Sequence, residues 1–212
     1  ETKREGERIM DFILSLAMQF WPMTIFIILV IIGFIINLFD RKKIKSIGFK
    51  YKDYPHLKPI RIATKGKGFW GALKLWVFGT RHWEVVKDFH YSFSGQNFVI
   101  PKGFKFDGAS VPKFLAQFLS PVGVLLIGGL IHDYGYKYET LLKKDGTDIG
   151  KKSQKWMDGV FRDINIEING FYFLNYLSYW ALRLGGWVAW NKHRDANEGI
   201  PKYLSGKGKT DK

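Results

Sequence analysis

The stretch Gly128-Gly-Leu-Ile-His-Asp-Tyr-Gly-Tyr136 is the segment around which the rest of the sequence is best interpreted. Its apolar residues lead directly to a polar pair, His132 and Asp133, and the run then breaks into glycine and tyrosine. Polar side chains at the end of an apolar segment need hydrogen-bond partners, because burial without them is costly. The sequence therefore predicts a buried core helix that ends in a polar site.

The composition is that of a folded and strongly basic protein. The 212 residues are 46% hydrophobic and 17% aromatic, which excludes a disordered or collagen-like polypeptide and leaves room for one domain and an appendage. The absence of cysteine excludes disulfides, thiolate catalysis and cysteine-ligated zinc. The net charge of +14 favours anionic neighbours, either phospholipid head groups or nucleic acid.

An uncharged apolar segment from Phe20 to Phe39 predicts a transmembrane helix. Its 20 residues match the length that a helix needs to cross a bilayer core of about 30 Å. The residues assigned to this span are Phe20, Trp21, Ile25, Ile28, Ile32, Ile36 and Phe39. Just upstream, polar residues recur at every fourth position, so residues 9–19 are predicted to form an amphipathic helix. A helix buried within a larger protein assembly is the alternative to a membrane span.

A basic segment follows the apolar one. Eleven lysines and arginines lie between Arg41 and Lys74, against the single acid Asp53, and this position favours lipid over DNA. The cations assigned to the membrane surface are Arg41, Lys42, Lys43, Lys45, Lys50 and Lys52. The span predicts a single-pass protein, in a virion membrane or host inner membrane, and the smaller number of cations before the span sets its orientation by the positive-inside rule. Its C-terminal domain is expected on the cytoplasmic or virion-interior side.

The rest of the chain predicts an α+β fold, with a small antiparallel sheet packed against a helical bundle and preceded by the single transmembrane helix. Short β-type runs over residues 83–100, with a turn at Ser94–Asn97, predict a hairpin. Helices are predicted at residues 111–119, from about 120 to the His-Asp pair, at 151–164, and at 171–194. The last of these is expected to be a core or membrane-surface helix, with a second membrane crossing as the alternative.

The predicted organisation has four parts. Residues 1–40 are assigned to the amphipathic lead-in and the transmembrane helix, and residues 41–68 to an irregular basic juxtamembrane segment. Residues 69–195 are assigned to the globular domain, and residues 196–212 to a flexible basic tail.

Several motifs, taken in order, resemble those of one family. They are Trp83-Glu-Val, Val99-Ile-Pro-Lys-Gly-Phe-Lys-Phe-Asp-Gly-Ala-Ser-Val-Pro112, His132-Asp-Tyr-Gly-Tyr136 and Asp158-Gly-Val-Phe161. Together they resemble the phage-associated family catalogued as domain of unknown function 1353, over about residues 83–190. The resemblance implies phage or prophage origin and no known activity. That family usually has an arginine shortly before its final aspartate, where this chain has Lys151, Lys152 and Lys155, so the basic partner of Asp158 is left open.

Two interpretations of the polar site follow. In the first, His132, Asp133 and Asp158 bind a divalent cation such as Zn²⁺, Mn²⁺ or Mg²⁺, and Asp107 acts as a general base or orients a ligand. All four residues are then catalytic candidates. In the second, they form a buried polar lock, in which His132 donates to Asp158 or to a carbonyl and Asp107 binds the amides of its own turn. A single histidine among carboxylates favours the lock.

Two functions are accordingly predicted. The preferred one is a membrane-anchored structural or virion-associated phage protein, part of an internal membrane or a genome-ejection apparatus, whose partners are the lipid bilayer and other virion or membrane proteins. The alternative is a membrane-tethered metal-dependent hydrolase acting on cell-envelope material. Nucleic acid as a main ligand rests on charge alone.

Overall fold

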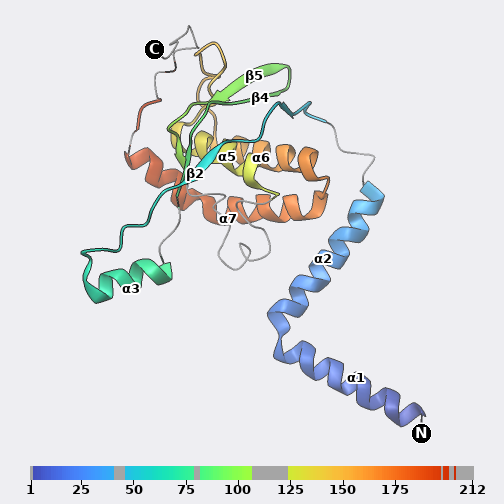
Figure 1. Cartoon of the computed structure of the whole chain (residues 1–212). Coiled ribbons are helices and arrows are strands. Elements are labelled where there is room, and N and C mark those ends of the chain that lie inside the picture. Colours follow the sequence, from blue (N-terminus) through green and yellow to red (C-terminus); the bar gives the residue numbers. More distant parts are fainter. Residues whose placement is uncertain are drawn as a thin grey trace. The chain divides into compact units, whose positions relative to one another are not determined.

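The computed structural model describes residues 2–40, 46–78, 82–106, 124–196, 198–200 and 203 (Figure 1). The chain divides into two compact units. One comprises residues 1–44 and 171–174, and the other comprises residues 45–170 and 175–212. The predicted Asp107 site, the predicted helix at 111–119 and most of the predicted tail lie outside the described residues.

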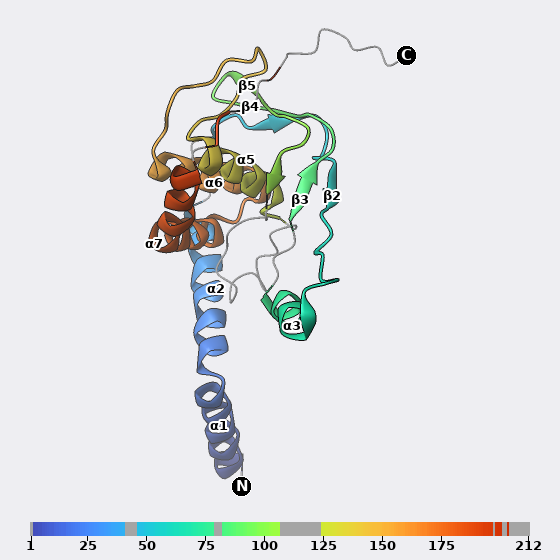
Figure 2. The ribbon, with the colours of Figure 1, turned by 90° about the vertical axis from the view of Figure 1, so that its left-hand side faces the viewer.

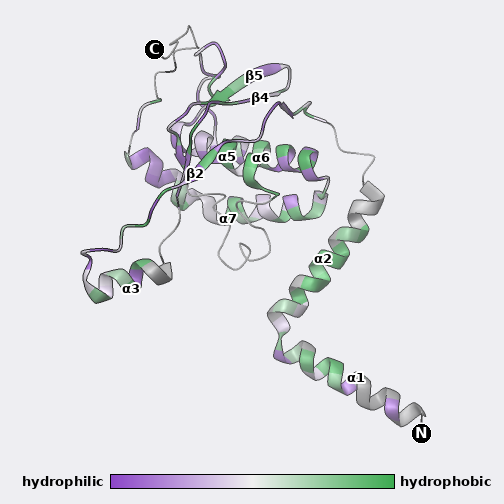
Figure 3. Cartoon of the chain, viewed as in Figure 1, coloured by the Kyte–Doolittle hydropathy of each residue, from purple (hydrophilic) through white to green (hydrophobic). Residues whose placement is uncertain are grey.

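The first unit contains the two N-terminal helices that the sequence predicts. Helix α1 spans Thr2–Gln19 and helix α2 spans Trp21–Asp40. The chain stays hydrogen-bonded between them, because the Phe20 amide donates to the Leu16 carbonyl at 2.9 Å. Apolar residues dominate α2 (Figure 3). Several of their side chains are exposed within the described chain, including those of Trp21, Ile25, Ile28 and Ile32, and Phe20 just before the helix is also exposed.

The predicted membrane segment is only partly within the described structure. Among the described residues, we find no helix with both the length and the apolar composition needed to cross a membrane. The side chains of Ile36 and Phe39 lie outside the described part, as do residues 41–45 with the predicted surface cations Arg41, Lys42, Lys43 and Lys45. Lys50 and Lys52 are described and exposed. The transmembrane crossing stays a prediction.

The second unit contains two small antiparallel sheets, as expected for the α+β class. One has the order β1-β4-β5 and the other the order β2-β3-β6. Their strands are β1 (Lys50–Tyr51), β2 (Leu57–Pro59), β3 (Trp83–Val85), β4 (Phe89–Phe93), β5 (Gln96–Ile100) and β6 (Lys105–Phe106). The predicted hairpin is confirmed as β4 and β5, which are joined at Ser94 and Gly95. Both turn residues have positive φ, 49° and 74°, as a tight two-residue hairpin turn requires.

The segment at residues 46–68, predicted as irregular, is partly ordered against the fold. Strand β1 pairs with β4, and β2 pairs with β3. Glu167 fixes the start of this segment, because its carboxylate accepts hydrogen bonds from the Ser46 hydroxyl at 2.6 Å and from the amides of Ile47 and Phe49 at 3.0 and 3.1 Å. Strands of two or three residues are too short to show an alternating pattern, which explains why the sequence does not reveal them.

Four helices lie within the described residues of the chain after residue 45. They are α3 (Gly68–Phe78), α5 (Leu126–Tyr138), α6 (Gln154–Asn169) and α7 (Tyr172–Ala196). The start of α6 follows from Ser153, whose hydroxyl accepts a hydrogen bond from the Trp156 amide, and its end follows from Gly170 at φ 67°. Helix α5 begins at Leu126, later than the start near residue 120 that the sequence predicts.

The core of the second unit forms around helix α5, which lies between the β4–β5 hairpin and α7 (Figures 1 and 2). Phe104, Leu130, Ile131 and Tyr134 are buried in this core. Two glycines of α5 permit close packing against α6, because a Cβ at Gly128 would overlap Asn165 and one at Gly135 would overlap Met157. The apolar run therefore forms a buried helix, as predicted.

Candidate functional site

Helix α5 carries His132 into the interior of the domain. The side chain of His132 is 1% exposed, and that of Asp158, which comes from α6, is fully buried. The imidazole Nε2 lies 2.9 Å from Asp158 Oδ1, so the hydrogen bond predicted by the lock interpretation is present. The imidazole is also packed between rings, with its centroid 3.9 Å from that of Tyr136 and 5.3 Å from that of Phe161.

Asp158 accepts further hydrogen bonds that fix its carboxylate. The Tyr136 hydroxyl donates to Oδ1 at 2.5 Å, and Arg183 Nη1 of helix α7 donates to Oδ2 at 2.7 Å. Gln154 donates in turn to the Tyr136 hydroxyl at 3.1 Å. We call His132, Tyr136, Asp158 and Arg183 the interior cluster. A buried carboxylate with these three partners is charge-balanced and hydrogen-bonded on both oxygens.

The electrostatics of the interior cluster favour the charged forms of its histidine and carboxylate. Burial lowers the pKa of His132, but the carboxylates of Asp133 and Asp158 outweigh it, so this pKa is raised above 6.5. Burial raises the pKa of Asp158, but His132, Tyr136 and Arg183 outweigh it, so this pKa is held below 3.8. Burial and the bond to Asp158 raise the pKa of Tyr136, which keeps the hydroxyl protonated as a donor.

The three predicted metal ligands lie close together. Within the described chain, no group of three histidine and acidic side chains is placed to hold a metal ion. The two imidazole nitrogens of His132 face different carboxylates, since Nε2 is bonded to Asp158 while Nδ1 lies 3.7 Å from Asp133. The donors therefore surround the imidazole and do not converge on one point where a cation would lie. Asp107, the fourth catalytic candidate, is outside the described residues.

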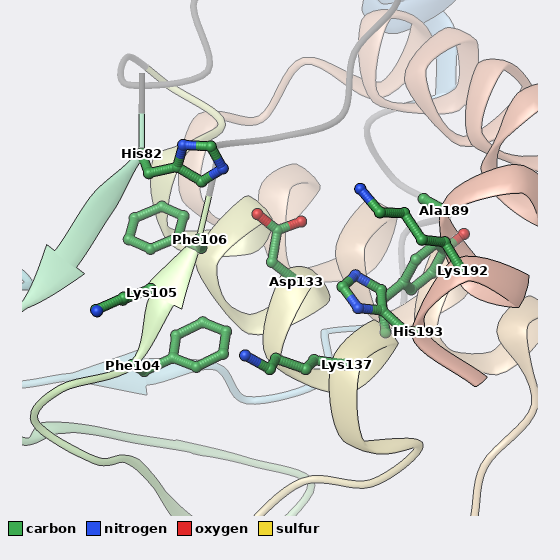
Figure 4. Close-up of a pocket in the computed structure, with 10 residues that line it drawn as sticks. His82, Phe104, Lys105, Phe106, Asp133, Lys137, Ala189, Lys192 and His193 are labelled. Carbon is green, nitrogen blue, oxygen red and sulfur yellow. The ribbon is translucent and has the colours of Figure 1, made fainter. Parts of the chain in front are cut away.

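Asp133 lies beside a cavity of about 260 Å³, separate from the interior cluster except for Tyr136 (Figure 4). Helices α5 and α7, strand β6 and the residue before β3 supply its walls. We call this cavity the basic pocket, because five of its lining residues are lysine or histidine and only one is acidic. Its lining residues are His82, Phe104, Lys105, Phe106, Asp133, Tyr136, Lys137, Ala189, Lys192 and His193.

Comparison with known proteins finds a similar family but no activity. The family model described as a protein of unknown function (DUF1353) matches residues 83–182. Residues 83–182 are therefore similar to the DUF1353 family. The resemblance inferred from the motifs is thus confirmed for that stretch, which contains β3 to β6, α5, α6 and the start of α7. Searches among curated proteins and among solved structures each returned no match.

The basic partner of Asp158 was not predicted from the sequence. Arg183 follows directly after the last residue that the DUF1353 model matches. Of the lysines considered in its place, Lys151 pairs with Glu139 at 3.2 Å and Lys152 lies over the Trp156 ring. One signal for Arg183 was available, because a single arginine inside an aromatic and apolar stretch of helix is rarely buried without a carboxylate partner.

Helix α7, which carries Arg183, also supplies a second arginine, Arg194, to the end of α5. Arg194 donates to the carbonyls of Tyr136 and Lys137 at 2.5 and 2.8 Å, and it pairs with Glu139 at 2.9 Å. Carbonyls at the end of a helix lack partners within the helix, and a cation placed there also complements the helix dipole. Arg183 and Arg194 together fix α5 and α6 against α7.

Proposed function

We propose that the protein is a membrane-anchored, non-enzymatic component of a phage particle or of its genome-ejection apparatus. In this proposal, the apolar segment from Phe20 to Phe39 crosses a lipid bilayer and the basic residues that follow bind the head groups. The DUF1353-like domain then contacts neighbouring virion or membrane proteins on the cytoplasmic or virion-interior side. The phage setting comes from the family resemblance, and the membrane setting comes from the chain itself.

The observation that carries this proposal is the exposed apolar surface of α2. Ile25, Ile28 and Ile32 are each between 44% and 49% exposed, and Trp21 is 62% exposed. A contiguous apolar surface of this kind is unfavourable in water and needs lipid or protein to cover it. The cationic residues that follow residue 40 favour lipid, because they would meet anionic head groups at the membrane surface.

Helix α7 offers a second surface that suits a membrane or a protein partner. Trp180, Leu184, Trp187 and Val188 are all more than half exposed, and their spacing places them on one face of the helix. Tryptophan is enriched at membrane–water interfaces, where its ring meets both apolar and polar surroundings. This arrangement supports the prediction of a membrane-surface helix.

The interior cluster supports a structural role for the predicted site. Asp158 is fully buried and has three hydrogen-bond partners, so neither of its oxygens faces solvent. Such a network stabilises the packing of α5, α6 and α7 without acting on a substrate. Nothing in the described residues favours the alternative, a membrane-tethered metal-dependent hydrolase acting on cell-envelope material.

Cell fractionation tests the anchor. The full chain, expressed in bacteria, is expected to stay in the membrane pellet after an alkaline carbonate wash. Replacing Ile28 and Ile32 together by lysine should release it, because each lysine near the middle of a bilayer costs about 3 kcal/mol. The matched control replaces the same two residues by leucine and should remain in the pellet. Recovery of the unsubstituted chain in the wash would contradict the proposal.

Orientation is tested by cysteine labelling, which the absence of native cysteine makes simple. Glu5→Cys and Thr64→Cys each place one thiol at an exposed position, before and after the apolar segment. In spheroplasts, a membrane-impermeant maleimide should label the Glu5→Cys chain and leave the Thr64→Cys chain unlabelled until the cells are lysed. Labelling of both in intact spheroplasts would show that the segment does not cross.

A further inference from the structure

The basic pocket has a chemistry that the proposed anchor does not use. It lies between β6, α5 and α7, and Phe104 and Phe106 form one of its walls (Figure 4). Lys137 and Lys192 contribute two positive charges against the single charge of Asp133, before any contribution from His82 and His193, whereas the exposed Lys105 extends from the strand face opposite Phe104 and Phe106. A concave site with an excess of one charge concentrates counter-charged ligands.

Two of these lysines are uncommitted to partners within the described part of the chain. Lys137 pairs with Glu198 at 2.7 Å, whereas the ion pairs found among the described residues do not include Lys105 or Lys192. Figure 4 shows the side chain of Lys192 extending from α7 toward the space in front of Asp133. Lys192 is thus placed to bind an anion in this cavity.

The volume of the pocket and the residues of its walls indicate which kind of ligand could bind there. A volume of about 260 Å³ is just below the range of about 300–1,000 Å³ typical of sites for drug-sized ligands. It therefore suits a small molecule. Lysine is a common phosphate ligand, and the phenylalanine wall suits the carbon skeleton of an organic phosphate better than an inorganic ion.

We propose that the basic pocket binds a small phosphate monoester. Lys192, with Lys137, binds the phosphate, and the organic part lies against Phe104 and Phe106. Such a group occurs on free metabolites and on the head group of phosphatidic acid. The proposal does not depend on the membrane anchor, because all the residues of the pocket belong to the second unit.

Calorimetric titration of the full chain in a neutral detergent tests this binding. Glycerol 3-phosphate should bind saturably with a dissociation constant below about 1 mM, a moderate affinity for a ligand of this size, and glycerol should not bind. Lys192→Gln should weaken binding about tenfold through the loss of one close charge, and Lys192→Arg should retain it. The matched control is Lys155→Gln, the same change at an exposed position on α6 outside the pocket, and it should have no effect.

Asp133 gives a test with the opposite sign. Asp133→Asn removes the negative charge that faces the pocket, so it should tighten the binding of glycerol 3-phosphate while Lys192→Gln weakens it. A general loss of folding cannot produce opposite changes in the two variants. Absence of saturation up to about 10 mM, or equal effects of Lys192→Gln and Lys155→Gln, would overturn the proposal.

A lipid analogue distinguishes the two sources of the phosphate. Dihexanoyl phosphatidic acid, used below the concentration at which it forms micelles, carries the same phosphate monoester with two short acyl chains. If a lipid head group is the ligand, this analogue should bind at least as tightly as glycerol 3-phosphate and should depend equally on Lys192. If a free metabolite is the ligand, the acylated analogue should bind more weakly, because its chains do not fit a cavity of this volume.

Discussion

His132 and Asp133 are neighbours in sequence, yet they belong to opposite kinds of environment. His132 lies in the interior cluster, where positive and negative groups are balanced and both oxygens of Asp158 accept hydrogen bonds. Asp133 faces the basic pocket, where lysines and histidines outnumber it. The difference shows that one helix end can stabilise a fold on one side and present a charged surface for binding on the other.

The largest loss of stability is expected when Asp158, the carboxylate that balances the charges of the interior cluster, is removed. Asp158→Ala leaves Arg183 and His132 without their common partner, so the free energy of unfolding should fall by about 3–5 kcal/mol. Chemical denaturation of the full chain in detergent, followed by tryptophan fluorescence, measures this loss. The control Asp163→Ala removes a carboxylate from the same helix that is 36% exposed, and it should cost less than about 1 kcal/mol. Similar losses of unfolding free energy in both variants would show that the interior cluster contributes no more to stability than an exposed carboxylate does.

The next largest loss of stability is expected from disturbing the close packing of α5 against α6 at Gly135. A methyl group at Gly135 would overlap the Met157 side chain, so Gly135→Ala should destabilise the domain by about 1–3 kcal/mol. Gly159→Ala is the matched control, because no atom lies within 4 Å of a Cβ there and helix propensity then favours alanine by up to about 1 kcal/mol. Opposite shifts in the thermal midpoints of the two variants are expected. Shifts of the same sign would contradict this account of α5–α6 packing.

The pH dependence of stability should show the separate contributions of His132 and Asp158 to the interior cluster. The pKa of His132 is raised above 6.5, so its contribution is complete below pH 6.5 and is lost as pH rises through the folded pKa. The pKa of Asp158 is lowered from 3.8, so its contribution is present above pH 3.8 and is lost as pH falls through the folded value. The thermal midpoint should therefore be highest between these limits. His132→Gln should flatten the alkaline side of the profile, and an unchanged profile would assign that side to other groups.

The smallest effect on stability is expected in the basic pocket. Lys105→Gln and Lys192→Gln break no ion pair in the described structure, so each should change the free energy of unfolding by less than about 0.5 kcal/mol. Denaturation of these variants alongside Asp158→Ala makes the comparison direct. A loss as large as that of Asp158→Ala would mean that the pocket is part of the structural framework.

The sequence predicted those features that depend on local chemistry. The β4–β5 turn follows from Ser94-Gly95, and the bond between His132 and Asp158 was one of those that the polar-lock interpretation allowed. Helix α6 was predicted from its apolar spacing, as a helix over residues 151–164, and its cap at Ser153 was not named. Arg183 could not be placed in the same way. Its partner lies 25 residues earlier in the chain, and an arginine in a helix can face the core, the solvent or a lipid head group.

The basic pocket was not predicted for a related reason. Its residues come from β6, α5, α7 and the position before β3, so no stretch of sequence contains more than a fragment of it. Lys105 and Lys192 resemble the many other lysines of a chain with net charge +14, and only their common position in space distinguishes them. The different surroundings of His132 and Asp133 on α5 likewise depend on α7, which supplies Arg183 to the interior cluster and Lys192 to the basic pocket.

The late position of Arg183 and Arg194 in the chain has a consequence for biosynthesis. When α5 and α6 leave the ribosome, Asp158 can meet His132 and Tyr136, but the guanidinium groups that complete its environment and the end of α5 have not yet been made. The domain therefore reaches its final packing only after α7 has been made. A chain that is truncated before residue 183 leaves a buried carboxylate without its arginine, so cellular proteases should degrade it faster than the full chain.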